Sequence, residues 1–401
     1  MLPSVIQTSL EVWAGTSLFF SLLLLFGVLR LRKTPPGPPP AWPAIVVLRP
    51  CEGDEPGLYE NLLSSCLAPY EGPRRVLLLC PSTSDPSYPL LLRVAKAAPP
   101  TIPVEVLLTR PEALHNRKVS QLLVGIARST EPILITADSD VLLGEKDLPS
   151  LVSLLCAPPS TPVQRQQVGI AFAAPVEQQP RTRWDRLSSA LVGGSVQNFM
   201  ALYGLYRLIG GVPSMAGALL AISRRALLDV GGLQEVRTIL GEDHELARRL
   251  CAAGYSVEQS PFPAHCSDGE RSLYGVISRV ARWLMVVRAQ RPLLLLTYPL
   301  FMAATPPLLV ATAILRTPLL SLLAGLIFTA RTLLSWLLRR AQHVQQGFFE
   351  SALEVIGAEL LLWTGLAKAL ATRQINWRGY RFRIARGGHM IPEAQAPSAQ
   401  P

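Results

Sequence analysis

Charged residues are scarce in this sequence. Only 16% of its 401 residues are Asp, Glu, Lys or Arg, whereas 49% are hydrophobic. Soluble domains carry about 25% charged residues, so part of this chain is expected to lie in lipid. Setting aside the apolar segments at both ends leaves roughly 250 residues, enough for one large α/β domain with its own core.

Two common kinds of site are also missing. No Gly-x-Gly-x-x-Gly follows the first expected strand, which argues against a dinucleotide-binding Rossmann domain. The six cysteines lie in the central region without a Cys-x-x-Cys pair, so their spacing indicates neither a zinc site nor a disulfide framework. They favour buried thiols in a reducing, cytosolic domain.

Basic residues outnumber acidic ones by 38 to 28. They do not gather into a solvated patch with interleaved aromatic residues, so we expect no nucleic-acid partner. Many instead flank apolar runs, as in Arg30–Lys33, Arg288–Arg291, Arg339–Arg340 and Arg373–Arg386. This placement suits the anionic surface of a lipid bilayer.

The N-terminal region reads as a membrane anchor. Val12–Leu29 is a run of 18 residues without a charge, about the minimum that spans a bilayer. No Lys or Arg precedes it, unlike in a signal peptide, and the basic residues after it place the N-terminus outside and residue 30 onward in the cytosol. Pro35–Pro40 is predicted to be a stiff spacer that lifts the next domain off the membrane.

The central region alternates between short apolar runs and helical periods. This alternation predicts an α/β domain with a mostly parallel, doubly wound sheet. The expected buried strands are Ala44–Leu48, Val76–Cys80, Val104–Leu108, Pro132–Thr136 and Val168–Ala173. The clearest expected helices are Leu58–Leu67, Lys118–Arg128 and Asp147–Leu155.

The C-terminal region is apolar again. Pro292–Leu315 has 24 residues without a charge and is predicted to be one membrane span. Thr317–Leu338 is a second candidate if Arg331 is paired or snorkels. Phe348–Leu370 contains three glutamates, so it is expected either at the interface or packed against protein. An outside N-terminus and an inside basic tail require an odd number of crossings, and three fit.

These segments divide the chain into six parts. They are an anchor at 1–33, a Pro-rich linker at 34–43, a catalytic domain at 44–270, an amphipathic interfacial helix at 271–291, a membrane region at 292–370 and a basic cytosolic tail at 371–401.

An Asp-x-Asp sequence directly follows the fourth expected strand. Asp138 and Asp140 would lie at the carboxyl edge of the sheet, where open α/β folds bind ligands. Two carboxylates there can hold Mg²⁺ or Mn²⁺, hard cations that take oxygen ligands and bridge to a diphosphate. The alternative is an ordinary turn, since Asp and Ser are frequent turn residues.

A second acidic group opens a helix at Gly241-Glu242-Asp243-His244-Glu245. Acids in a first turn are usually caps, because they satisfy free N–H groups and the helix dipole. A carboxylate in this position, such as that of Asp243, is also well placed to act as the general base for a hydroxyl.

A third group precedes the expected C-terminal spans. Arg279, Arg282 and Trp283 fall on about one face of a helix, and Val280 and Leu284 belong to an apolar face that could lie on the membrane interface. The simpler interpretation is a juxtamembrane helix with snorkelling arginines and an aromatic belt. The functional interpretation places an Arg fork against diphosphate oxygens.

In this order, the three motifs resemble the D2, D3 and (Q/R)xxRW signatures of the ceramide glucosyltransferase family, within the broad GT-A glycosyltransferases. The resemblance runs over nearly the whole chain. Residues 49–53 look like that family's exit from the first strand, residues 116–118 like its Asn-x-Lys, and residues 375–383 like its C-terminal ending. Related hopanoid-directed glycosyltransferases share this architecture.

The resemblance implies a GT-A-like fold, Mg²⁺ or Mn²⁺, and inverting transfer of a hexose from a UDP-sugar donor, UDP-glucose above all, to the primary hydroxyl of a lipid such as ceramide. It assigns Asp243 as the base and Asp138 and Asp140 as metal ligands. The donor-binding residues that it implies are Asp85, Lys118, Asp138, Arg279, Arg282 and Trp283. The chain departs from the family at residues 195–198, which lack a histidine that eukaryotic members show near this point.

Three other functions fit parts of this pattern. A hopanoid-lipid glycosyltransferase using UDP-N-acetylglucosamine is the nearest. A processive polysaccharide synthase also uses Asp-x-Asp, but it needs a channel through many helices. A membrane scaffold or transporter has no need for intact acids at Asp138, Asp140 and Asp243. The sequence therefore favours an integral membrane enzyme with a cytosolic catalytic domain, which in a bacterium means the inner membrane.

Overall fold

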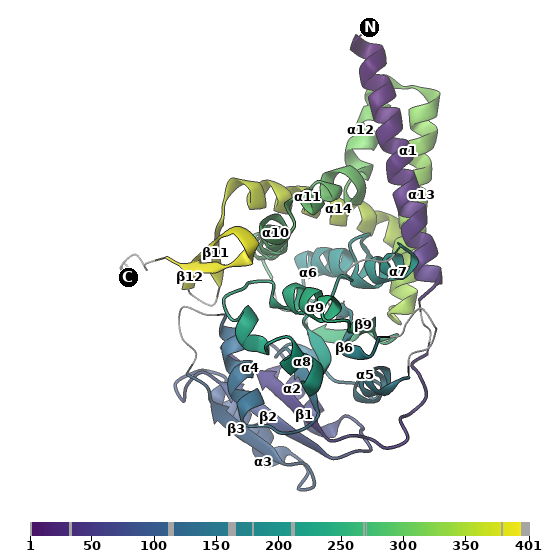
Figure 1. The fold of residues 1–401 in the computed structure, drawn as a ribbon. Coiled ribbons are helices and arrows are strands. Elements are labelled where there is room, and N and C mark those ends of the chain that lie inside the picture. The colour runs from purple at the N-terminus through teal and green to yellow at the C-terminus, as the bar shows by residue number, and fades with distance from the viewer. Residues whose placement is uncertain are drawn as a thin grey trace.

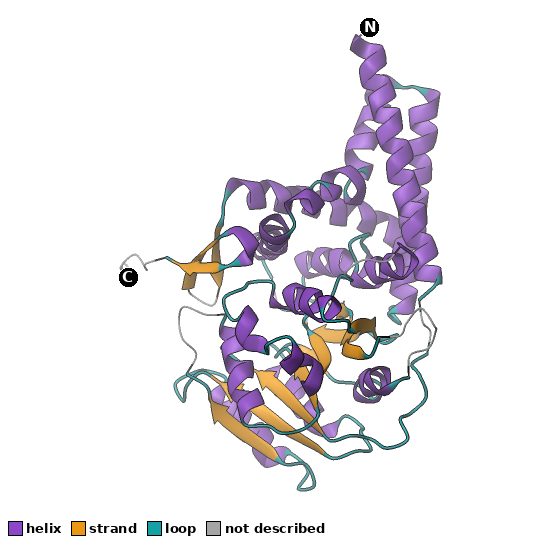
Figure 2. Ribbon diagram, in the orientation of Figure 1, coloured by secondary structure: helices purple, strands orange, loops and turns teal. Residues whose placement is uncertain are grey.

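The computed structural model describes residues 2–31, 34–110, 116–158, 166–178, 180–209, 213–267, 269, 271–377 and 380–393. Long helices form a bundle at one end, and an α/β domain lies at the other (Figure 1). Strands occur in the α/β domain and again near the C-terminus (Figure 2). The expected Arg32, Lys33, Arg378 and Gly379 lie outside the described residues.

A seven-stranded sheet in the order β3-β2-β1-β4-β8-β6-β9 forms the centre of the α/β domain. All neighbouring strands are parallel except β8, which runs antiparallel to both β4 and β6. This arrangement confirms the expected mostly parallel sheet of an α/β domain. The strands are β1 Ile45–Pro50, β2 Arg74–Cys80, β3 Val104–Leu108, β4 Ile133–Ala137, β6 Val168–Ala173, β8 Leu219–Ser223 and β9 Ser256–Gln259.

Alternate side chains of the strands bury themselves on opposite faces of this sheet. Val47 and Val76 pack on one face, and Val46 and Leu77 pack on the other. The first face is covered by α2 Leu58–Leu67, α3 Tyr88–Ala97 and α5 Asp147–Cys156. The second is covered by α4 Arg117–Ala127, α8 Arg224–Asp229 and α9 Glu242–Ala252.

Two smaller sheets surround this core. One has the order β5-β10-β7 and lies next to the Asp-x-Asp turn; its strands are β5 Val141–Leu142, β7 Pro175–Gln178 and β10 Ala264–Ser267. The other is formed by β11 Gln374–Trp377, β12 Tyr380–Ile384 and β13 Met390–Pro392. The helices between β7 and β8 are α6 Arg183–Ser189, the π-helix η1 Ala190–Gly194 and α7 Phe199–Ile209.

The first and third helices of the bundle are α1 Leu2–Leu29 and α13 Pro318–Ala341, and both are long and apolar enough to cross a membrane. The expected span at Pro292–Leu315 is not one straight helix. It is broken into α11 Pro292–Leu295, the π-helix η3 Tyr298–Met302 and α12 Thr305–Leu315, and its two halves meet at a bend of 48°. Pro306 and Pro307 have no N–H to donate to the preceding turn, so one continuous helix cannot form there.

Arg331 of α13 is buried and paired, as the sequence required for a second span. Its guanidinium binds Glu359 and donates to the carbonyl of Phe301 at the helix break. The Glu359 carboxylate also accepts from the backbone N–H of Thr305 at 2.8 Å and from its hydroxyl at 2.8 Å. The backbone groups that the break frees are thereby satisfied inside the bundle.

Helix α14, Phe348–Ala371, lies crosswise at the foot of the bundle in Figure 1. It packs along α10, Leu273–Gln290, and exposes Phe349, Leu353 and Leu360 on its other face. The apolar face expected to place α10 on the membrane interface is instead buried in the protein, where Val280 and Leu284 join the core beneath α14.

The spacer role expected for Pro35–Pro40 is also wrong, because the α/β domain touches the anchor directly. Helix α1 crosses α7 so closely that a Cβ atom on Gly27 would lie 2.8 Å from the backbone nitrogen of Leu205. A Cβ atom on Gly204 would meet the Gly27 carbonyl carbon at 2.6 Å. Only a pair of glycines permits this approach, and it holds the domain against the last turns of α1.

The expected basic tail is folded in its described part. The third sheet docks on the loop that precedes α9, where the N–H of Met390 donates to Thr238 at 2.8 Å and the N–H of Leu240 donates to Gly388 at 3.0 Å. Alternation explains the sheet, since Phe382 and Ile384 point into the core while Arg381 and Arg383 stay exposed.

Candidate functional site

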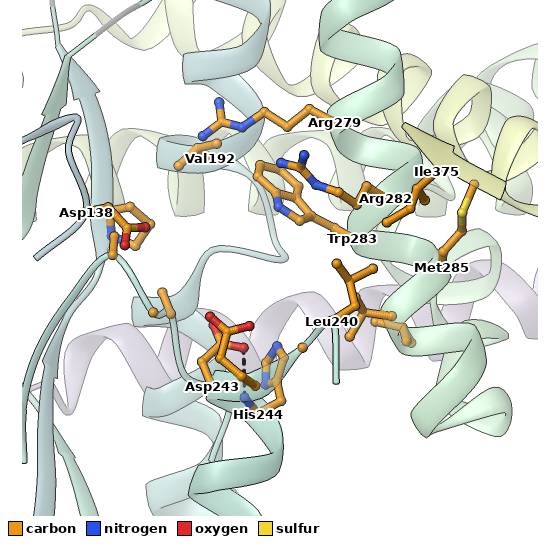
Figure 3. Close-up of a pocket in the computed structure, with 18 of the residues that line it drawn as sticks. Asp138, Val192, Leu240, Asp243, His244, Arg279, Arg282, Trp283, Met285 and Ile375 are labelled. Carbon is orange, nitrogen blue, oxygen red and sulfur yellow. Dashed lines mark hydrogen bonds between the residues drawn. The ribbon is translucent and has the colours of Figure 1, made fainter. Parts of the chain in front are cut away.

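A cavity of about 1390 Å³ lies where the carboxyl ends of the strands face α10. Figure 3 shows Asp138 on one side, Asp243 and His244 below, and Arg279, Arg282 and Trp283 on the opposite wall. The three motifs singled out in the sequence therefore meet in one place, although more than 140 residues separate the first from the last.

The Asp-x-Asp turn joins β4 to β5. The N–H of Asp138 donates to the carbonyl of Ala218, just before β8, at 2.9 Å, and the N–H of Val141 closes the turn on the Asp138 carbonyl at 3.0 Å. Ser139 binds Glu55 through its hydroxyl. The Oδ1 atom of Asp140 is buried and has no hydrogen-bond partner among the described residues. Burial, reinforced by the charge of Asp138, raises the pKa of Asp140 to about 6.

Lys118 connects the Asp-x-Asp turn with the start of α9. Its ammonium group lies 2.6 Å from Asp138 Oδ1 and 3.7 Å from Glu242 Oε1, and it donates to the Gly217 carbonyl at 2.9 Å. Burial alone would lower the pKa of Lys118, but the charges of Asp138 and Glu242 outweigh burial and raise it. Lys118 is thus close to the expected donor site, with its charge balanced by acids of the protein itself.

Asp243 lies in the first turn of α9 and points into the cavity (Figure 3). One of its oxygens, Oδ1, accepts from the N–H of His244 at 2.8 Å. The neighbouring Glu242 has its pKa raised to about 7, first by burial and then by the charge of Asp243. Gly217 leaves room for Asp243, because a Cβ atom on this glycine would lie 3.0 Å from Asp243 Oδ2.

Helix α10 supplies the basic wall. Arg279 binds Glu177, donates to the Ser188 hydroxyl at 3.1 Å, and places its guanidinium 4.8 Å from the centre of the Trp283 ring. The arginines at 279 and 271 outweigh the effect of burial and lower the pKa of Glu177. Arg279 is therefore held rigidly, and it lowers the cost of ionising Asp140 across the cavity.

Asp85 was expected to bind the sugar donor, but it is not among the residues that line the cavity. Its carboxylate accepts from the Gly53 N–H at 3.0 and 3.2 Å and from the Ser87 N–H at 2.9 Å, which ties the exits of β1 and β2 together. The cavity wall next to it is formed by Cys51 and Glu52.

Sequence reasoning missed several residues of the site. Glu242 was visible as part of an acidic run, but only the fold shows it bound to Asn116 at 3.0 Å and close to Lys118. Glu177 carries no motif, and neither does Gly217. The C-terminal sheet adds Arg381 to the cavity wall.

The fit to a divalent cation rests on the Asp-x-Asp turn. Among the described residues, no three His, Cys, Asp or Glu side chains converge to make a closed metal site. Asp140 nevertheless offers a buried oxygen without a partner, beside the second carboxylate of Asp138. Such a donor set suits Mg²⁺ or Mn²⁺, which readily complete their coordination with phosphate oxygens and water.

Comparison with known proteins, taken together with the apolar helices long enough to cross a membrane, identifies a membrane-associated glycosyltransferase that acts on lipid. The model of glycosyl transferase family 21 matches residues 11–390, so the chain belongs to that family.

Two curated relatives come from Caenorhabditis elegans. The chain is 22% identical to Ceramide glucosyltransferase 3 over 362 residues, which cover 87% of this chain and 74% of that protein. It is 21% identical to Ceramide glucosyltransferase 1 over 274 residues, which cover 68% and 56%. Among solved structures, the mannosyltransferase PcManGT from Pyrobaculum calidifontis, in complex with GDP-Man and Mn²⁺, matches with a TM-score of 0.47 and 18% identity, over 90% of this chain and 99% of that one.

We predict that Asp140→Asn makes the cation-free protein more stable. The folded protein raises the pKa of this carboxyl from 3.8 to about 6, so its ionisation at pH 7.5 opposes folding and an amide removes that cost. The unfolding temperature in detergent should rise by a few degrees, and the further rise caused by Mn²⁺ with UDP should disappear. Glu71→Gln, at an exposed position outside the cavity, is the control and should change neither value. A lower unfolding temperature, or an undiminished response to Mn²⁺, would contradict the role of Asp140.

Proposed function

We propose that this protein transfers glucose from UDP-glucose to the primary hydroxyl of ceramide or of a closely similar lipid, with inversion at the anomeric carbon. The observation that carries the proposal is the meeting of Asp138, Asp140 and Asp243 with Arg279, Arg282 and Trp283 in one cavity next to the membrane helices. The relatives named ceramide glucosyltransferase support the choice of lipid and sugar.

In this mechanism Asp243 takes the proton of the acceptor hydroxyl as the hydroxyl oxygen bonds to the anomeric carbon. The bond from that carbon to the diphosphate breaks in the same step, and UDP leaves with the electron pair. Asp243 is suited to this role because it faces the cavity and spends one oxygen on the His244 N–H, which leaves Oδ2 for the acceptor.

The leaving diphosphate would lie between the acidic turn and α10. Mg²⁺ or Mn²⁺ held by Asp138 and Asp140 would neutralise its charge. From the other side, Arg279, Arg282 and Trp283 line the cavity and would contact the diphosphate. Lys118, 2.6 Å from Asp138, would orient that carboxylate and approach the donor. Asp85 would act from behind the wall, by fixing the loop at Gly53 on which the nucleotide rests.

The direct test is to incubate the purified full-length protein with UDP-glucose, UDP-galactose or UDP-N-acetylglucosamine, together with ceramide or a hopanoid, and to determine the product by mass spectrometry and NMR. We expect β-linked glucosylceramide and no product after chelation of divalent cations. A hopanoid product from UDP-N-acetylglucosamine would replace the proposed substrates, and transfer in excess chelator would remove the metal from the proposal.

We predict that Asp243→Asn lowers kcat by about 10² to 10⁴, the usual effect of losing a general base, while UDP binding stays near that of the wild type. The amide keeps the size of the side chain but cannot accept the proton. Glu245→Gln is the control and should keep kcat within about twofold, because Glu245 lies in the same helix turn but outside the cavity lining, where it binds Arg248 at 2.6 Å. Near-normal turnover by a folded Asp243→Asn variant would return Asp243 to a capping role.

We further propose that the α/β domain and the C-terminal sheet lie in the cytosol. The basic residues after α1, the direction of the bundle and the cytosolic supply of nucleotide sugars support this orientation. Ser160 lies outside the described residues, so the exposed Glu71 serves as the probe. In a cysteine-free protein, Glu71→Cys should resist an impermeant thiol reagent in intact cells. Arg316→Cys, at the α12–α13 turn beside the N-terminal end of the bundle, should react. The reverse pattern would overturn the orientation.

A further inference from the structure

The cavity has a second, apolar arm that the transfer reaction with a nucleotide sugar does not use. Phe199, Leu202, Tyr206 and Ile209 of α7 line it at spacings of three, four and three residues, so one continuous stripe of this helix faces the cavity. The stripe begins beside the proposed base, because the Phe199 ring lies 6.4 Å from that of His244. From Phe199 to Ile209 the stripe runs about 15 Å along the helix.

The broken membrane segment adds further apolar residues to the cavity lining. Leu294 of α11 and Tyr298 and Met302 of η3 line the same cavity. This segment packs beside the middle of α1. There the Leu300 carbonyl accepts from the Trp13 indole at 2.6 Å and from the Ser17 hydroxyl at 2.8 Å. The arm therefore reaches the level of the membrane bundle.

The outer end of the arm is apolar and open. Ile209 is 66% exposed and Leu294 is 40% exposed, although both also line the cavity. Leu293 and Leu296 continue this exposed surface along α11, at 82% and 58%. Leucines so exposed next to spanning helices are stable in hydrocarbon and costly in water.

We propose that this arm is a lateral channel from the bilayer that holds a hydrocarbon chain of the acceptor lipid. The chain lies between α7 and the α11–η3 segment, with its outer end between Ile209 and Leu294 and its polar head at Asp243. Only one part of this inference rests on the proposed function, namely that the bound lipid is the acceptor of the sugar. The apolar stripe begins beside the proposed base and ends at exposed leucines next to the membrane helices. A membrane lipid, with a polar head and a hydrocarbon chain, is the occupant that matches both ends.

The break in the membrane segment gives this channel its second wall. Arg331 and Glu359 bind the groups freed at the break and hold η3 in place. The close Gly27–Gly204 crossing fixes α7 against α1 on the other side. Both walls are thus attached to the same bundle.

A kinetic test uses a larger side chain to narrow the outer end of the proposed channel. Ile209→Trp should raise KM for a ceramide with an 18-carbon acyl chain by about tenfold or more, equivalent to about 1.4 kcal/mol. KM for a six-carbon ceramide and the affinity for UDP should stay within about twofold. Leu228→Trp is the matched control, because Leu228 is equally exposed at 64% on α8, outside the cavity, and it should change neither KM. An equal effect on both ceramides, or none on the longer one, would overturn the channel.

A binding test does not depend on catalysis. A ceramide with a diazirine in its acyl chain should crosslink to α7 and α11 of the full-length protein in vesicles, and excess ordinary ceramide should compete for these sites. Labelling of Leu353, on the exposed face of α14, should not be competed, because bulk lipid reaches it. The channel would be overturned if ordinary ceramide reduced labelling at no position, or if it reduced labelling only on elements other than α7 and α11. Competed labelling without any transfer would instead contradict the proposed function and leave the channel standing.

Discussion

The buried ion pair of Arg331 and Glu359 holds the part of the membrane region on which the cavity depends. A helix that breaks inside lipid leaves backbone groups without partners, at a cost of several kcal/mol for each. Here Glu359 accepts from the N–H of Thr305, and Arg331 donates to the carbonyl of Phe301. Ser21 of α1 also accepts from Arg331 at 3.2 Å. One pair therefore joins α1, α13 and α14 at the bend, and the bent segment lines the cavity with Leu294, Tyr298 and Met302.

The polar end of the cavity differs from this buried ion pair, because acidic groups are in excess on one of its walls. Acids gather around Lys118, and burial raises the pKa values of Asp140 and Glu242. Across the cavity Arg279 is already balanced by Glu177. The protein thus carries an excess of acid on one wall and a braced guanidinium on the other. Such a site is unfavourable when empty and becomes favourable when a cation and a diphosphate enter together, as is usual where stability is given up for function.

Local patterns in the sequence predicted local structure well. The expected bounds of Leu58–Leu67 and Val168–Ala173 are those of the structure, because their periodicity and their turn residues agree. Contacts between distant segments could not be predicted in this way: nothing in the sequence announces that Gly217 must make room for Asp243. Two features of the structure had signals in the sequence. The prolines inside Pro292–Leu315 indicate the bend in that segment, and the alternation in Tyr380–Ile384 indicates the strand in the basic tail.

The chain of contacts from the membrane to the proposed base explains why so much of the C-terminal region is folded. Helix α14, which carries Glu359, packs along α10, and Gln290 at the end of α10 donates to the Gly241 carbonyl at 3.2 Å. The C-terminal sheet binds the same loop through Leu240. Asp243 therefore stands at a fixed depth relative to the bundle. The bilayer sets the depth of a lipid hydroxyl. In the proposed function, the base that takes the proton of this hydroxyl must therefore be fixed to the membrane helices as firmly as to the sheet that would hold the donor.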